Sequence, residues 1–390
     1  MTSHAKLSAS ASKRWMSCPP SVALEANFPD KTTSYAEEGT KAHGLGELLL
    51  RVELGGNDGA DIAEAQAYSA ECSKEMQDAV DVYVDLVLEK FNAAKAISSD
   101  AVLLLEQKLN FSKWVPEGFG TGDAIIIADG MCEIIDYKHG KGVQVSAENN
   151  SQMRLYALGA YSMYDLFYGI EHVTMTIVQP RKDNISSESM DIKELLIWAK
   201  KDVAPKAKLA WAGKGEFKAG DHCQFCRAGA TCTARAEQIF QPIQAFDRDD
   251  PKLLDDYDIA TLLELLPPFI KWAKTVTDYA FNEALAGKAW PGWKLVEGRS
   301  NRAFTDAGQV EKTLLANEYK EAVIKKPAEL LGVKAIEDLL GKRKFAELLS
   351  DFIVKPPGKP ALVAESDKRE AINVGLAAAQ AAFEEEVSNA

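Results

Sequence analysis

The middle of the chain changes from helical to strand periodicity, and this change restricts the possible folds more than any other feature. Three short apolar runs rich in β-branched residues follow one another at 101–109, 123–128 and 132–138, with turn residues between them. A further run, 172–180, is closed by Pro180. Because helical periodicity flanks this block, the pattern predicts an α/β fold in which helices flank a mixed central sheet.

The flanking helices are predicted from apolar residues spaced three and four apart. They cover 34–54, 63–93, 148–168 and 189–212, after a short helical start within 1–30. Beyond about residue 240 we expect a mostly helical region, namely two helices broken at Pro267-Pro268, a strand pair at 290–304, and helices at 306–354 and 368–388. The predicted domains are 1–240 and 241–390, with the boundary near 237–250.

Composition limits the classes of function. With 45 Lys and Arg against 58 Asp and Glu, the net charge is −13, which excludes a diffuse basic surface and leaves only a local patch for nucleic acid. No window approaches about 18 uninterrupted apolar residues, so no membrane span is expected. The first twenty residues contain no apolar core of a secretory signal. We therefore expect a reducing cytoplasm, where cysteines serve as metal ligands or catalytic groups.

Acidic residues mark the predicted hairpin. Asp123 opens one strand, and Asp136 lies near the end of the next, two residues before Lys138. Side chains alternate along a strand, so Asp136 and Lys138 share a face, and hairpin pairing brings Asp123 close to them. Carboxylates gathered in this way favour Mg²⁺ or Mn²⁺, which would activate water for attack on a phosphoryl group with help from the lysine. Glu106 and a neutral His43 could approach the same site.

Four short motifs strengthen this interpretation, although an Asp-x-Lys pair alone is usually a solvated ion pair and a lone helical histidine is usually structural. They are Gly39-x3-His43, Gly122-Asp123, Asp136-Tyr137-Lys138 and Gln152-x3-Tyr156. In this order they resemble the motifs of the RecB-like branch of the PD-(D/E)xK nucleases. The resemblance covers about residues 5–236 and implies a restriction-endonuclease-like core. The whole length also resembles a phage and prophage family with the same signature.

The resemblance implies roles for individual residues. The metal ligands would be His43, Asp123, Asp136 and the backbone carbonyl of Tyr137, with Glu106 as a weaker candidate. Lys138 would act on the water, and Gln152 and Tyr156 would position the DNA backbone or the catalytic groups. Ala124 stands where the family commonly has an arginine, which removes one expected phosphate or substrate contact.

Three of the six cysteines form a Cys-x2-Cys-x5-Cys run at Cys223, Cys226 and Cys232, which needs one further ligand for a four-coordinate site. With Cys18 near the N-terminus, the pattern resembles the AddB-type iron–sulfur nucleases. That resemblance implies a [4Fe-4S] cluster held by these four thiolates, closing the two ends of the nuclease domain. Zinc is the alternative, with His222 in place of Cys18.

Cys72 and Cys132 have no partners at ligand spacing and are predicted to be core residues.

The C-terminal region offers a second candidate contact with DNA. Arg299 and Arg302 lie beside tryptophans, and Lys355 and Lys359 belong to a locally basic stretch, a combination that could line a DNA channel. The alternative is that the tryptophans belong to a core and the charges to a solvated face.

These features predict a Mg²⁺- or Mn²⁺-dependent deoxyribonuclease using two-metal-type hydrolysis. An exonuclease that acts on DNA ends or single strands in phage replication or recombination is favoured over an endonuclease. A phage single-strand-binding protein or recombinase is a plausible partner in the bacterial host cytoplasm. The second hypothesis is a catalytically weak DNA-binding or scaffold protein that retains the fold and the cluster. A plain metal-binding regulator is disfavoured, because it has no need of the lysine.

Overall fold

The computed structural model describes residues 5–29, 34–55, 59–244, 254–294 and 341. All of these except Gly341 belong to one compact unit, Met1–Ser300. The predicted domain boundary near 237–250 overlaps 245–253, outside the described residues, and stays a prediction. Among the described helices, none combines the length and the apolar character that a membrane span needs.

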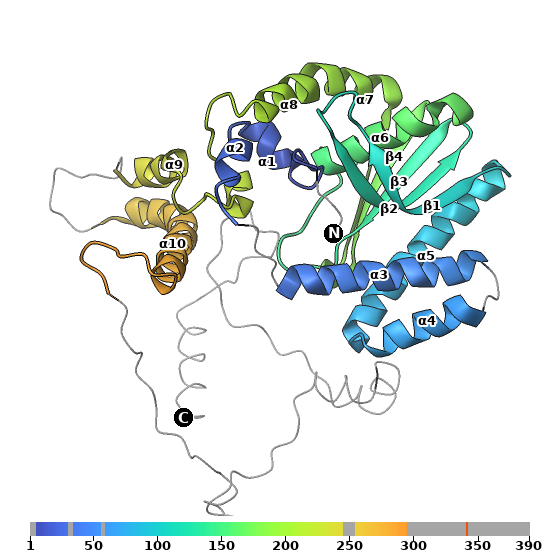
Figure 1. The fold of residues 1–390 in the computed structure, drawn as a ribbon, viewed down its shortest axis with the longest axis horizontal. Coiled ribbons are helices and arrows are strands. Elements are labelled where there is room, and N and C mark those ends of the chain that lie inside the picture. The colour runs from blue at the N-terminus through green and yellow to red at the C-terminus, as the bar shows by residue number, and fades with distance from the viewer. Residues whose placement is uncertain (1–4, 30–33, 56–58, 245–253, 295–340, 342–390) are drawn as a thin grey trace, which may run out of the picture. The chain divides into compact units, whose positions relative to one another are not determined.

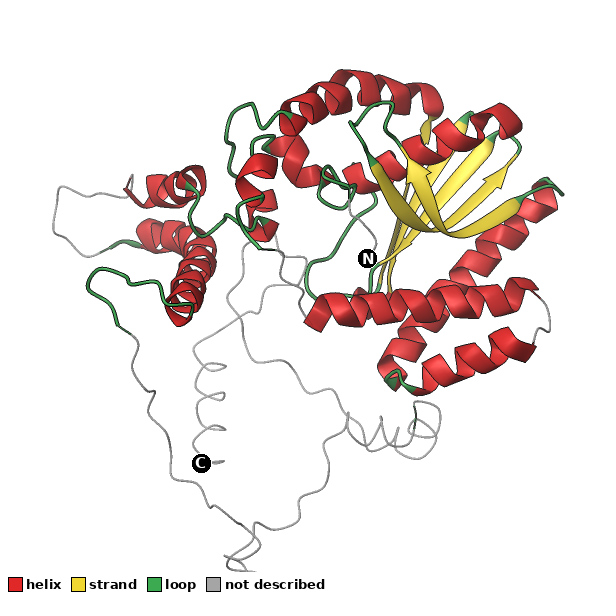
Figure 2. Ribbon diagram, viewed as in Figure 1, coloured by secondary structure: helices red, strands yellow, loops and turns green. Residues whose placement is uncertain are grey.

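A five-stranded mixed sheet forms the centre of this unit, which confirms the predicted α/β class (Figures 1 and 2). In spatial order its strands are β1 (Val102–Asn110), β2 (Phe119–Ala128), β3 (Met131–Tyr137), β4 (His172–Gln179) and β5 (Asn184–Asp191). The β3–β4 pair is parallel and the other three pairs are antiparallel. The parallel pair requires a crossover, which helix α6 (Ser151–Tyr168) supplies.

Helices cover both faces of the sheet (Figure 1). On one face α3 (Ser34–Gly55) and α5 (Lys74–Ile97) enclose one apolar cluster, and on the other α6 encloses a second. Alternate residues of β2 divide between the clusters, with Ile125 facing α6 and Ile126 facing α5. The central strands are buried on both faces, which explains why they read as continuous apolar runs.

The remaining elements are short or peripheral to the sheet. They are α1 (Ser12–Ser17), α2 (Ser21–Glu25), α4 (Gly59–Ala70), η1 (Pro180–Lys182), α7 (Ile192–Trp198), η2 (Ala199–Val203), α8 (Ala204–Trp211), η3 (Asp221–Phe225), α9 (Thr233–Gln244) and α10 (Asp256–Leu285). The described part of the C-terminal region is therefore helical, as predicted.

Two predicted helices differ from the structure. The helix expected over 63–93 is divided into α4 and α5, because the Ser73 side chain accepts a hydrogen bond from the backbone N–H of Met76 and starts a new helix. Pro267 and Pro268, expected to break a helix, lie inside the continuous α10. Proline removes a helical hydrogen bond, but its fixed φ is compatible with the helix.

Strand β5 was not predicted, because its sequence, NISSESMD, is mostly polar. Hydrogen-bonded hydroxyl pairs across β4 and β5 compensate: the hydroxyl oxygens of Thr176 and Ser187 lie 2.9 Å apart, and those of Thr174 and Ser189 lie 3.0 Å apart. The helix expected over 189–212 therefore begins only at Ile192. Residues 290–294 contain no strand, and the rest of the predicted 290–304 pair, like the helices at 306–354 and 368–388, lies outside the described residues.

Helix α6 approaches β1 closely because Gly159 lies at their contact. A Cβ atom added to Gly159 would lie 2.8 Å from the Cβ of Leu109, closer than packed atoms approach. Gly39 on α3 has no such neighbour within 4 Å of its added Cβ. The two helical glycines therefore form a matched pair for separating packing from helix propensity.

We predict that Gly159→Ala lowers the free energy of unfolding by about 1–2 kcal/mol, because overpacking outweighs the helix propensity of alanine. Gly39→Ala should be neutral or stabilising by up to about 1 kcal/mol. Urea unfolding followed by circular dichroism measures both. A Gly159→Ala protein that gains as much stability as Gly39→Ala would contradict the close helix–strand contact.

Candidate active site

Three carboxylates form a row across the strands β1, β2 and β3. Ala124 pairs with Leu105 on one side and with Ile135 on the other. Continuing both antiparallel registers by one residue places Asp123 between Glu106 and Asp136. Directly opposed side chains of an antiparallel pair lie about 4.5–5.5 Å apart at Cβ. The structure thus brings together the two aspartates of the predicted hairpin and Glu106, which was expected as a weaker candidate for the same site.

Glu106 has an unusual backbone conformation. Its φ of 44° lies in the left-handed region, although it stands within β1. A non-glycine residue pays strain energy there, and such strain commonly accompanies functional sites. The sequence gives no signal for this conformation.

His43 reaches the row from α3. Its Nδ1 lies 3.2 Å from Oδ1 of Asp123. The ligand atoms of His43, Glu106 and Asp123 all lie within 4.8 Å of one another, a spacing that can hold a metal ion. The other oxygen of Asp123, Oδ2, accepts a hydrogen bond from the backbone N–H of Tyr137 at 2.7 Å. This bond turns Oδ1 of Asp123 toward the histidine.

Asp136 belongs to an adjoining group rather than to the closest set of ligand atoms. Its Oδ2 lies 2.8 Å from Nζ of Lys138, and its Oδ1 accepts a hydrogen bond from Nε2 of Gln152 at 3.1 Å. The same Gln152 accepts from Lys138 at 3.3 Å and donates to the hydroxyl of Tyr156 at 3.2 Å. One amide therefore orients the carboxylate, the lysine and the tyrosine. The role of the Tyr137 carbonyl as a ligand stays a prediction.

Local structure explains how Gln152 and Tyr156 reach the site. Asn150 caps α6 by accepting hydrogen bonds from the backbone N–H groups of Gln152 and Met153, which fixes the first turn. Gly120 leaves room for the tyrosine, because an added Cβ would lie 2.6 Å from the Tyr156 ring. The close packing of Tyr156 thus explains why position 120, the first glycine of the GTGD segment, has no side chain.

Burial and mutual repulsion alter the acidity of the row. Burial raises the pKa of Asp136, and the charge of Asp123 adds to this effect. Burial and the Asp123 carboxylate also raise the pKa of Glu106 to about 7. Burial acts to lower the pKa of His43, but Asp123 outweighs it and raises that pKa to about 9. His43 in turn outweighs the burial of Asp123 and lowers the pKa of that carboxyl. The metal-free site therefore holds protons that a divalent cation would displace.

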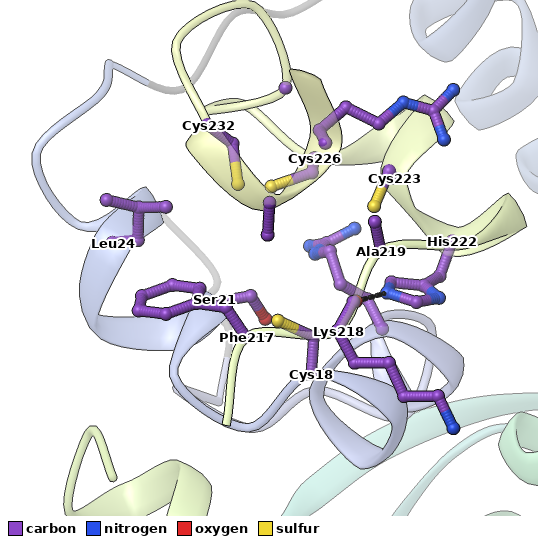
Figure 3. A pocket seen from close by; sticks show the side chains of 14 residues that line it. Cys18, Ser21, Leu24, Phe217, Lys218, Ala219, His222, Cys223, Cys226 and Cys232 are labelled. Carbon is purple, nitrogen blue, oxygen red and sulfur yellow. Dashed lines mark hydrogen bonds between the residues drawn. The ribbon is translucent and has the colours of Figure 1, made fainter. Parts of the chain in front are cut away.

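The four cysteines predicted to act together line one cavity (Figure 3). Cys18 follows α1, and the other three come from η3 and the loop after it, so the cavity joins segments about 200 residues apart in the chain. Figure 3 shows their sulfurs directed into the space between these segments. Gly229 keeps the cysteine loop tight, because an added Cβ would lie 3.0 Å from the carbonyl oxygen of Cys226.

The spacing of these thiols bears on the kind of metal. Zinc–sulfur bonds of about 2.3 Å in a tetrahedron place sulfurs about 3.8 Å apart. Among the described residues, the group with three ligand atoms within 4.8 Å of one another is the His43 group, and the four cysteines do not form one. His222 donates from Nε2 to the carbonyl of Lys218 at 2.9 Å. The kind of metal at these cysteines, an iron–sulfur cluster or zinc, stays a prediction.

A buried carboxylate fastens the two sides of the cysteine cavity. Glu25 on α2 accepts a hydrogen bond from Nε of Arg14 at 2.8 Å and another from the backbone N–H of Arg227 at 2.8 Å. Arg14 also donates to the carbonyl of Phe225 at 3.1 Å. The sequence did not predict these contacts, because Arg14, Glu25 and Arg227 belong to no motif.

The other predicted residues lie elsewhere. Cys72 and Cys132 are buried in the two apolar clusters, which confirms them as core residues. The four candidate DNA contacts lie outside the described residues; they are Arg299, Arg302, Lys355 and Lys359.

The raised pKa of Glu106 predicts how pH affects the metal-free protein. The folded state binds this proton up to a pH of about 7, whereas an ordinary glutamate side chain releases it near 4.5, so stability should fall as the pH rises between these values. Glu106→Gln should remove this fall and make the metal-free protein about 1–2 kcal/mol more stable at pH 8, after allowance for solvent screening.

Urea titrations in EDTA at several pH values measure this effect. The exposed Glu89→Gln on α5 is the control and should retain the wild-type pH profile. Parallel profiles for wild type and Glu106→Gln would show that Glu106 is not held in the row.

Comparison with known families gives a match along most of the chain. Residues 4–370 match the family described as "Protein of unknown function (DUF2800)". The matched range contains both candidate sites, from Cys18 to Cys232, and extends far into the C-terminal region. This description assigns no activity, so a function has to be argued from the geometry of the sites. The chain belongs to the DUF2800 family.

Proposed function

We propose that this protein is a metal-dependent DNA nuclease that hydrolyses phosphodiester bonds with Mg²⁺ or Mn²⁺. The observation that carries the proposal is the cross-strand row of Glu106, Asp123 and Asp136, with His43 at one side and Lys138 at the other. Like charges held close together in a partly buried site repel one another, and a divalent cation removes that repulsion. DNA as the substrate follows from the resemblance of the four motifs to those of RecB-like nucleases.

Each residue of the site has its own role in the proposed reaction. The bound cation would lower the pKa of water and stabilise negative charge on a phosphate oxygen. His43, Glu106 and Asp123 carry the nearest set of ligand atoms, and Asp136 adjoins them on β3. Gln152 holds Lys138 and Asp136 in a fixed relation, so the ammonium faces the place where a phosphate would meet the row.

The protonation state of Lys138 depends on its carboxylate partner Asp136. Burial acts to lower the pKa of Lys138, but the Asp136 carboxylate outweighs it and raises that pKa, so Nζ keeps its proton in the metal-free protein. A cation that binds Asp136 weakens this partner and makes the proton on Nζ easier to release. The lysine can then orient an attacking water or exchange a proton with it. A site for metal storage would gain nothing from this residue.

We further propose a [4Fe-4S] cluster at Cys18, Cys223, Cys226 and Cys232, with zinc as the alternative. An all-thiolate set around one cavity supports the cluster. The backbone N–H of Gly220 lies 3.4 Å from Sγ of Cys223, a contact of the kind that stabilises cluster sulfurs. Burial raises the pKa of Cys226 to about 12, so this thiol stays protonated until a metal binds.

We predict that Asp136→Asn and Lys138→Met each lower the rate of Mn²⁺-dependent DNA cleavage at least about a hundredfold, because each removes a charge at the reacting phosphate. End-labelled linear DNA and closed circular DNA, each single- and double-stranded, are the substrates. An exonuclease degrades the linear forms and spares the circles.

Asp129→Asn is the matched control, since Asp129 is an exposed carboxylate at the opposite end of the same β2–β3 hairpin. It should cleave as the wild type does. Full activity in Asp136→Asn or Lys138→Met, with cluster content unchanged, would refute the nuclease assignment.

A protein prepared without oxygen should contain about four iron and about four sulfide per chain and absorb visible light. Cys18→Ser and Cys226→Ser should each lose most of the iron, whereas Cys72→Ser, whose side chain does not line the cavity, should retain it. One zinc per chain and no iron in the wild type would support the alternative.

A further inference from the structure

Arg181 is a buried arginine that the proposed chemistry does not use, although it lies beside the site. It stands in η1, directly after β4, and its side chain is only 11% exposed. Its Nη1 donates to Glu38 of α3 at 2.9 Å and to the backbone carbonyl of His139 at 3.3 Å. Its Nη2 lies 3.5 Å from Glu75 of α5. One guanidinium therefore joins two helices to the chain segment that leaves β3.

These contacts lie close to functional residues on both sides. On α3, Glu38 precedes His43 by five residues, which is about 1.4 helical turns. After β3, His139 directly follows Lys138. The guanidinium thus connects the element that carries the histidine ligand with the element that carries Asp136 and Lys138.

Polar contacts rather than apolar burial hold the first turns of α3. None of the residues from Tyr35 to Lys41 is buried, and Ala42 is the first core residue of the helix. The Glu38 ion pair with Arg181 therefore fixes α3 ahead of the point where the core takes over. A small rotation there would move the imidazole of His43, whose Nδ1 lies only 3.2 Å from Asp123.

Tyr137 provides a second link along the same path. Its hydroxyl lies 2.8 Å from Nδ1 of His139, and its ring meets that of His43 edge-on with centroids 5.5 Å apart. His139 is thus fixed through its carbonyl by Arg181 and through its ring by Tyr137. Because the ring of Tyr137 also packs against the imidazole of His43, the position of His139 affects the position of that imidazole.

We infer that Arg181 is a positioning residue that sets α3 against the end of β3 and thereby aligns His43 with Asp123 for cation binding. This inference rests on the proposed function and deepens it. Residues that support metal ligands from outside typically change metal affinity 10–100-fold when they are mutated. Loss of Arg181 should therefore weaken the binding of Mn²⁺ about tenfold, although Arg181 touches no ligand atom directly.

The test compares Arg181→Met, Arg181→Lys and Arg154→Met in the full-length protein. Arg154 is a matched control, since it is 12% exposed and pairs with Glu188, but it ties α6 to β5 rather than to α3. Glu38 is 37% exposed, so it can be hydrated when its partner is lost, and the Arg181 variants should fold. Calorimetry gives the Kd for Mn²⁺, thermal unfolding gives stability, and cleavage is followed against the Mn²⁺ concentration.

We expect the Kd for Mn²⁺ to rise about tenfold in Arg181→Met and less in Arg181→Lys, with the maximal cleavage rate largely restored at saturating Mn²⁺. Arg154→Met should lose stability but keep the wild-type Kd. If the wild type binds Mn²⁺ and Arg181→Met binds it equally well, Arg181 is only structural and the inference is wrong. If Arg181→Met does not fold, Arg181→Lys decides by the same comparison. A wild type that binds no Mn²⁺ refutes the proposed function itself, and this inference with it.

Discussion

Repulsion between three close carboxylates, one buried (Asp136) and two half-buried (Glu106 and Asp123), is the constraint around which this site is organised. Glu106, Asp123 and Asp136 occupy neighbouring positions on three adjacent strands, where hydrogen-bond register leaves them little freedom to separate. Without a cation the protein relieves this repulsion with protons and ion pairs. A protonated His43 faces Asp123, Lys138 faces Asp136, and Glu106 holds a proton up to a pH of about 7. Each arrangement is one that a divalent metal can replace.

The layered fold explains why helices from both faces meet at this row. The hairpin of β2 and β3 is buried on both sides, and Asp136 of the row lies near the carboxyl end of β3. There α3 reaches in from one face with His43 and α6 from the other with Gln152. The cysteine cavity is linked to the same helix α6, because Ser12 of α1 lies 2.6 Å from Ser151 at its first turn. The two candidate sites therefore share one structural support.

The sequence predicted the hairpin and its carboxylates for local reasons. Asp129 and Gly130 form a two-residue turn with Gly130 at a φ of 74°, and this turn fixes the register that sets Asp123 opposite Asp136. Cys18 and His43 could be named only as candidates until the resemblance gave them roles, because their partners lie on other elements and no local pattern encodes such a contact. The strained φ of Glu106 also had no sequence signal. Strand β5 was missed because its hydroxyl pairing with β4 replaces the apolar alternation that identifies strands. Arg181 acts through a tertiary network of ion pairs, which only the fold assembles.

The most direct test of the account is an anomalous-difference map from crystals soaked in Mn²⁺. The account predicts a peak about 2.0–2.3 Å from ligand atoms of His43 and Asp123, with Asp136 or Glu106 completing the coordination through their oxygens. Lys138 should remain close by without touching the ion. A map with no peak at this row, or with manganese bound only at surface carboxylates, would contradict the claim that the row exists to hold a catalytic cation.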